Sequence, residues 1–197
     1  KHHFAVSACI LQKDAKIGKI IGFYSVVFAA HTLLFFYSQQ YFADFGYNKV
    51  QISVIMLLVG GASCLGALAS EKMYRRFGKR CLIPETVIIA AAILCYGSGK
   101  AGVAAAALMC AGFANAALYP IQSDSLNALI PSEQRATLIS VDSMCFSIAM
   151  IVLFPLAGAL ADRWGLKTVL LLLGAILLLF LLTVFCIEKE SFSSDHS

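Results

Sequence analysis

The stretch TVLLLLGAILLLFLLTVFCI, residues 168–187, decides the fold class of this chain. It contains no charged side chain, and Thr168 and Thr183 are its only polar residues. A helix needs about 20 mainly apolar residues to cross the hydrocarbon core of a bilayer, and this stretch is that long. It predicts a membrane-spanning helix that faces lipid on most of its sides.

The composition of the whole chain agrees with that stretch. Of the 197 residues, 60% are hydrophobic and 13% are charged, whereas soluble proteins have about 25% charged residues. Mean hydropathy is +0.83, which leaves too little polar surface to cover a water-facing domain. These values exclude a soluble enzyme, a disordered chain and a secreted disulfide-rich protein. The 7 cysteines lack C-x-x-C spacing, so we expect small hydrophobes and neither a disulfide framework nor a metal site.

Six apolar spans follow one another along the chain, separated by short polar breaks. Membrane β-strands would alternate with period 2 in segments of about 10 residues, and no such pattern is present, so helices remain. We predict an all-α polytopic membrane protein, with a cytoplasmic linker at 1–16, a six-helix transmembrane domain at 17–187 and a cytoplasmic tail at 188–197. The spans are residues 17–43, 50–70, 82–97, 103–126, 136–161 and 168–187.

The distribution of Lys and Arg predicts the orientation. With a cytoplasmic N-terminus, eleven of the 15 basic residues fall in the inner segments and four in the outer loops. Cytoplasmic loops carry the excess of Lys and Arg in membrane proteins. Both ends of the chain are therefore expected in the cytoplasm, and the plasma membrane is the expected location.

Polar side chains recur on the first, fourth and fifth spans, which predicts a solute pathway; those of the fifth span are Ser140, Asp142, Ser143 and Ser147. Such groups are costly in lipid, so they should face a bundle interior or a wet cavity. The alternative for each is a hydrogen bond between helices that needs no substrate. The predicted pathway residues are Tyr24, His31, Ser38, Gln39 and Gln40 on the first span, and Asn115, Tyr119 and Gln122 on the fourth.

Four ionisable residues in or near the spans have two interpretations each. His31 lies near mid-membrane and is either a substrate contact or protonation switch, or a histidine bonded to a neighbouring helix. Asp142 and Asp124 are candidate proton sites or gate partners, or acids satisfied at helix ends. Arg135 could pair with either acid and close an inner gate.

A short repeat links the second and fifth spans. Residues 66–70, GALAS, recur as GALAD at 158–162, three helices later. Because three is odd, the two copies should lie on opposite sides of the membrane, as in the inverted three-plus-three repeats of secondary transporters.

The residues around this repeat resemble the major facilitator superfamily. GALADRWG at 158–165 fits G-x-x-x-D-R-x-G, and RFGKR at 76–80 fits the basic end of the same signature. LNALIPSEQRAT at 126–137 and FPLAG at 154–158 look like the tenth and eleventh helices of that family. The resemblance implies the C-terminal six-helix half of a twelve-helix carrier, with the first residues ending a central loop.

The resemblance also implies a mechanism, partners and gating residues. Two halves would rock about a central site. The expected partners are a small solute, membrane lipids and a missing N-terminal half, with a proton as a candidate coupling ion; nucleic acid is not expected. In the loop signature aligned on Gly78, the Gly and Asp places hold Glu71 and Arg75; aligned on Gly66, the Asp place holds Ser70 and extra residues follow. In both alignments the charged contacts that the family forms in this loop are altered. The implied gating or proton-coupling residues are Glu71, Arg75, Arg76, Asp162 and Arg163, beside Asp124, Arg135 and Asp142.

Three rival functions remain open. Within transporters, an efflux carrier for drugs or metabolites is not separated from an uptake permease. A six-helix assembly factor or sensor would not need the polar face of the first span or the repeat. An enzyme is the weakest rival, because neither H-E-x-x-H nor G-x-S-x-G occurs, and no catalytic group or cofactor is expected. Six helices alone should not carry solute, because half of the cavity wall would be missing.

Overall fold

A computed structural model describes residues 15–78, 82–128 and 135–194, and every regular element in these ranges is helical. The six predicted helices are confirmed; each expected span lies within one helix, except that residues 82–97 are divided between α4 and η2. Their bounds are α2 Ala15–Asp44, α3 Lys49–Phe77, α4 Leu82–Cys95 with the short 3₁₀ helix η2 Tyr96–Ser98, α5 Ala101–Asn127, α6 Arg135–Trp164 and α7 Leu166–Ser194.

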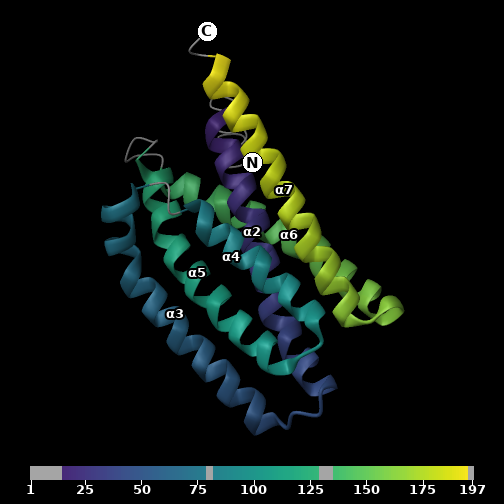
Figure 1. Cartoon of the computed structure of the whole chain (residues 1–197). Coiled ribbons are helices and arrows are strands. Elements are labelled where there is room, and N and C mark those ends of the chain that lie inside the picture. Colours follow the sequence, from purple (N-terminus) through teal and green to yellow (C-terminus); the bar gives the residue numbers. More distant parts are fainter. Residues whose placement is uncertain (1–14, 79–81, 129–134, 195–197) are drawn as a thin grey trace.

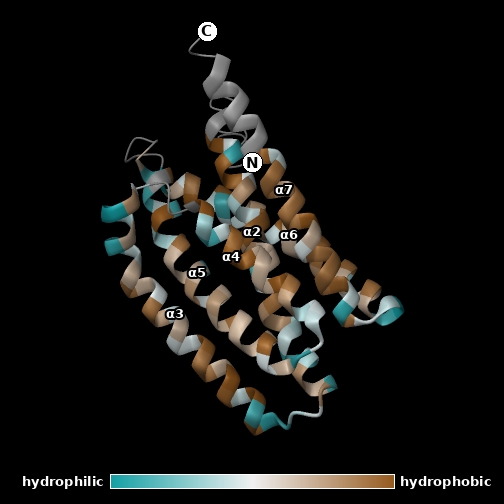
Figure 2. Cartoon of the chain, viewed as in Figure 1, coloured by the Kyte–Doolittle hydropathy of each residue, from teal (hydrophilic) through white to brown (hydrophobic). Residues whose placement is uncertain are grey.

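The helices run alternately up and down, so both described ends lie at the same end of the bundle (Figure 1). Five of them are long and apolar enough to cross a membrane, and the helical stretch Ile83–Ser98 is apolar but shorter. Apolar residues fill the middle of each helix and polar ones gather at the turns (Figure 2). The expected linker and tail fall partly outside the described ranges; α2 begins at Ala15 and α7 continues to Ser194.

The core forms around α4, which packs against α5 and α7. Ile89, Ile93 and Tyr96 are fully buried there. Gly174 allows α7 to approach α4 closely, because a Cβ atom at this position would be too near Leu94. The shortest span thus contributes to the buried core, and the apolar sixth span packs against it.

The contact between α3 and α5 is the most extensive in the bundle. A Cβ atom at Gly66 would overlap the backbone carbonyl of Phe113, so glycine is required for this approach. Ser70 donates a hydrogen bond of 2.9 Å to the carbonyl oxygen of Ala117 in the same contact. Backbones that lie this close gain van der Waals contact, which drives helix association in lipid.

Two helices leave most of their apolar surface uncovered by this chain. In the most apolar 18-residue stretch of α6, no residue is buried within the bundle; in the corresponding stretch of α3, 11% of the residues are buried. Leu57 and Leu68 of α3 and Ile151 of α6 are more than 70% exposed. These faces are available to lipid or to another polypeptide.

Candidate functional site

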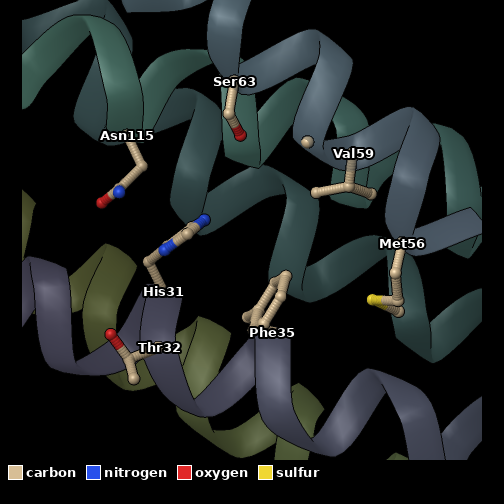
Figure 3. A pocket seen from close by; sticks show the side chains of 8 residues that line it. His31, Thr32, Phe35, Met56, Val59, Ser63 and Asn115 are labelled. Atoms are coloured by element: carbon tan, nitrogen blue, oxygen red, sulfur yellow. The ribbon is translucent and has the colours of Figure 1, made fainter. Parts of the chain in front are cut away.

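A pocket of about 420 Å³ opens between α2, α3 and α5, near the middle of each helix (Figure 3). Drug-sized ligands occupy clefts of roughly 300–1,000 Å³, so the pocket can hold a small organic molecule. Its walls are formed by His31, Thr32 and Phe35 of α2, Met56, Val59, Gly60 and Ser63 of α3, and Asn115 of α5.

His31 and Asn115 bring polar atoms with no protein partner to this pocket. The Nε2 atom of His31 and the Oδ1 atom of Asn115 are buried, and neither forms a hydrogen bond within the described residues. Leaving such a buried group unpaired costs about 1–3 kcal/mol. Thr32 differs, because its hydroxyl donates to the Phe28 carbonyl of its own helix at 2.7 Å. His31 and Asn115 are therefore the groups that a ligand would satisfy.

A second, smaller pocket of about 90 Å³ lies between α5 and α6, nearer the end where the N-terminus of α2 lies. Gln122 and Asp142 line it, and the Gln122 amide is 3.4 Å from Oδ1 of Asp142. That hydrogen bond is long, so it is a weak one. Ser123, Asn127 and Ser143 add further polar groups to the wall.

One face of α5 connects the two pockets. Asn115 lines the first, and Tyr119 and Gln122, four and seven residues later, line the second. The rings of Tyr119 and Phe28 are in contact, with centroids 5.7 Å apart. Because α2 and α5 run in opposite directions, this aromatic pair lies between the two pockets along the bundle. The helical spacing of the α5 residues thus identified one continuous polar face.

The other pathway residues predicted on α2 lie elsewhere. Tyr24 is buried in the apolar core. Ser38 is also buried, and its hydroxyl lies 2.6 Å from the hydroxyl of Tyr96, the first residue of η2. Gln39 and Gln40 are exposed, and Gln40 donates to Asp44 at 2.7 Å. None of these four residues lines either pocket.

The predicted gating charges are mostly at the surface. Arg75 pairs with Glu71 at 2.6 Å, one turn away on α3, and no other ion pair occurs among the described residues. The Arg76 guanidinium lies 5.7 Å from the ring centre of Phe77. In the described part of the chain, Asp142 is bonded to Gln122 and not to Arg135. The remaining predicted charges, Asp124, Arg135, Asp162 and Arg163, are all exposed.

Sequence reasoning missed two features of the interior. The pocket residues of α3 carry no polar periodicity, so only the structure assigns that helix to the wall. Glu85 of α4 is 1% exposed, and neither of its carboxyl oxygens has a hydrogen-bond partner within the described residues. Its position beside Pro84 at the start of an apolar helix was the one available signal.

Comparison with known proteins assigns a family to this all-helical bundle with its pocket between α2, α3 and α5. The family model of the Major Facilitator Superfamily matches residues 20–195. The chain belongs to this superfamily, which makes it a multi-pass membrane protein and a transporter of small solutes. No curated protein and no solved structure gives a significant match to the chain.

Proposed function

We propose that the chain is a secondary transporter that moves a small solute by alternating access, with the pocket between α2, α3 and α5 as part of the solute site. The observation that carries this proposal is the pair of unpartnered buried atoms, His31 Nε2 and Asn115 Oδ1, at mid-helix depth. Secondary transporters bind substrate near the bilayer midplane. A solute bound at this depth would supply the hydrogen bonds that these two atoms lack within the protein.

An inverted repeat is the second part of the proposal. The repeated glycines occupy corresponding contacts: Gly66 of the second helix lies against the fourth, and Gly158 of the fifth lies beside Tyr37 of the first. The Tyr37 hydroxyl also donates to the carbonyl of Phe154 at 3.0 Å, which joins the first helix to the fifth. A relation that exchanges helices one to three with four to six would produce this pairing.

The uncovered faces of α3 and α6 support a second six-helix body as partner. Their apolar surface is continuous with helices that line the pockets, so a packed partner there would complete the cavity wall. Rocking of two such bodies would expose the pocket to each side of the membrane in turn. In this arrangement Asp142 and Arg135 form an ion pair in one state and separate in the other, at the cytoplasmic end. A proton is the candidate coupling ion.

The aromatic pair of Phe28 and Tyr119 acts as the barrier between the two pockets in this proposal. It lies where a solute leaving His31 and Asn115 would have to pass toward Gln122. Rotamer changes of exposed side chains are fast, so such a pair can open without a large helix movement. Tyr119 is 58% exposed, which gives its ring room to turn.

Reconstitution into lipid vesicles tests the transport proposal. Vesicles are loaded with a mixture of small metabolites, and the solutes that escape are identified by mass spectrometry. Where the chain is reconstituted as an assembly with a second six-helix body, such as a homodimer, at least one solute should equilibrate with the wild type and with the control Thr183→Val, whose hydroxyl bonds only its own helix. Vesicles with His31→Phe should retain that solute. If no solute distinguishes the wild-type assembly from empty vesicles, the proposal is wrong. Full transport by a monomeric six-helix chain contradicts its second-body part alone.

A further inference from the structure

The residues of the mid-depth pocket divide into a polar end and an apolar end. In Figure 3, His31, Thr32 and Asn115 lie at one end, and Met56 and Val59 lie at the other. Helix direction gives the same order, because α2 runs opposite to α3 and α5. At 1.5 Å per residue, Met56 and Ser63 are separated by about 10 Å along the helix. The pocket is therefore long enough for a ligand with two chemically different ends.

The polar end can both donate and accept hydrogen bonds. A side-chain amide has two N–H donors and a carbonyl acceptor, and a neutral imidazole has one donor and one acceptor nitrogen. The two atoms without a partner belong to residues on different helices, α2 and α5, and both residues line the pocket. A head group that satisfies both must reach across the gap between these helices.

No charged side chain is among the eight residues that line the pocket. An ion that enters a low-dielectric site without a counter-charge has a large desolvation cost. His31 is the one titratable group on the wall, and no carboxylate lines the pocket to pair with an imidazolium. The wall is therefore matched to a neutral head group. Asp142 belongs to the second pocket and is bonded to Gln122.

Resting on the proposed transport function, we propose that this pocket selects neutral amphiphiles: molecules with an apolar or aromatic body and an uncharged head that donates and accepts hydrogen bonds. The body lies against Phe35, Val59 and Met56. A primary amide head is the simplest example, because it can pair with Asn115 through two hydrogen bonds and still reach His31.

Four probes that share one phenyl body test this selectivity. 2-Phenylacetamide is neutral, phenylacetate is an anion, 2-phenylethylammonium is a cation, and ethylbenzene has no hydrogen-bonding head. Binding is measured at pH 7.5 as displacement of tritiated 2-phenylacetamide from the purified protein in lipid nanodiscs. The amide should bind at least about tenfold more tightly than each of the other three. Ethylbenzene leaves the polar groups of the site unpaired. The two ions have a desolvation cost that no counter-charge in the pocket offsets.

Three variants show whether that preference arises in the pocket. Asn115→Leu keeps the approximate volume and removes both hydrogen-bonding functions, so amide affinity should fall about tenfold or more. Asn115→Asp supplies the missing counter-charge and should transfer the preference to 2-phenylethylammonium. The control Thr183→Val lies on α7, away from the pocket, and should bind as the wild type does.

The outcomes separate this inference from the transport proposal. Equal or tighter binding of an ion or of ethylbenzene, unchanged affinity in Asn115→Leu, or no saturable amide binding would overturn the selectivity. Transport of some other solute could still be observed in that event, and the carrier assignment would stand. Conversely, amide binding that depends on Asn115, together with the absence of any transport, would retain the selectivity and contradict the carrier.

Discussion

The Ser70 hydroxyl of α3 donates a hydrogen bond of 2.9 Å to the Ala117 carbonyl of α5, three residues before Pro120. Proline has no N–H, so α5 loses one internal hydrogen bond at this turn. Ser70 supports the loosened turn from the neighbouring helix, and it is the last residue of the repeated GALAS segment. The contact therefore joins α3 to α5 within one turn of the proline, where α5 lacks one internal hydrogen bond.

Removal of that hydroxyl should weaken the bundle. Ser70→Ala is expected to lower the free energy of unfolding by about 0.6–1 kcal/mol, the usual size of an interhelical hydrogen bond in a membrane protein. Unfolding by SDS in mixed micelles measures the change. Ser147→Ala is the matched control, because its exposed hydroxyl bonds only to the Ser143 carbonyl of its own helix. Equal effects of the two substitutions would contradict a role for the contact with Ala117.

Gly66 should be intolerant of even one added methyl group. Gly66→Ala places a Cβ atom on the Phe113 carbonyl, so α3 must move away from α5 at an expected cost of about 1–3 kcal/mol or more. Gly61→Ala is the control, because nothing lies near its Cβ position and alanine favours the helix. The same SDS titration compares them. A Gly66→Ala protein as stable as the wild type would show that this helix contact is not formed.

Glu85 should tolerate loss of its charge. Both of its carboxyl oxygens are buried without a partner in the described part of the chain, so an ionised form gains nothing there. Glu85→Gln, a neutral side chain of similar size, should leave the stability unchanged or raise it. The control Glu71→Gln breaks only an exposed pair with Arg75 and should change the stability by less than about 0.5 kcal/mol. A loss above about 1 kcal/mol in Glu85→Gln alone would reveal a paired carboxylate.

The barrier assigned to Phe28 and Tyr119 predicts a change in access. A cysteine introduced at Ser63, on a background without native cysteines, reports entry of a small thiol reagent into the mid-depth pocket. Tyr119→Ala should speed its modification from the side on which α2 begins, because the ring pair no longer separates the two pockets. Ile148→Ala, at an exposed position of α6, serves as the control. Unchanged modification rates in Tyr119→Ala would show that the pair of Phe28 and Tyr119 does not restrict access to the pocket.

The expected orientation can be checked with cysteines at the helix ends. Substitution of Lys49 or Lys100, at the turns that end the bundle opposite the N-terminus of α2, should give labelling by an impermeant maleimide from outside intact cells. Substitution of Lys72, near the other end of α3, should give labelling only after the membrane is opened. The reversed pattern would place both ends of the chain outside.

The sequence predicted the helices well because each apolar span is long and is interrupted by turn residues. It predicted less about which helices touch. Tyr24 and Ser38 share a helical face with His31, yet α4 packs against part of that face and Ser38 bonds to Tyr96. Periodicity describes one helix at a time, so it cannot distinguish a face turned to a cavity from one turned to a neighbour. For the same reason the wall contributed by Met56 and Ser63 was not foreseen.

The polar face of α5 has a consequence for the speed of passage. Asn115, Tyr119 and Gln122 follow one another at intervals of about 6 and 4.5 Å along the helix axis. In the proposed pathway, a solute can therefore keep a hydrogen bond to one of these groups while it forms a hydrogen bond to the next. The solute would then keep at least one hydrogen bond throughout, so the free-energy barrier to its movement is divided into several smaller barriers.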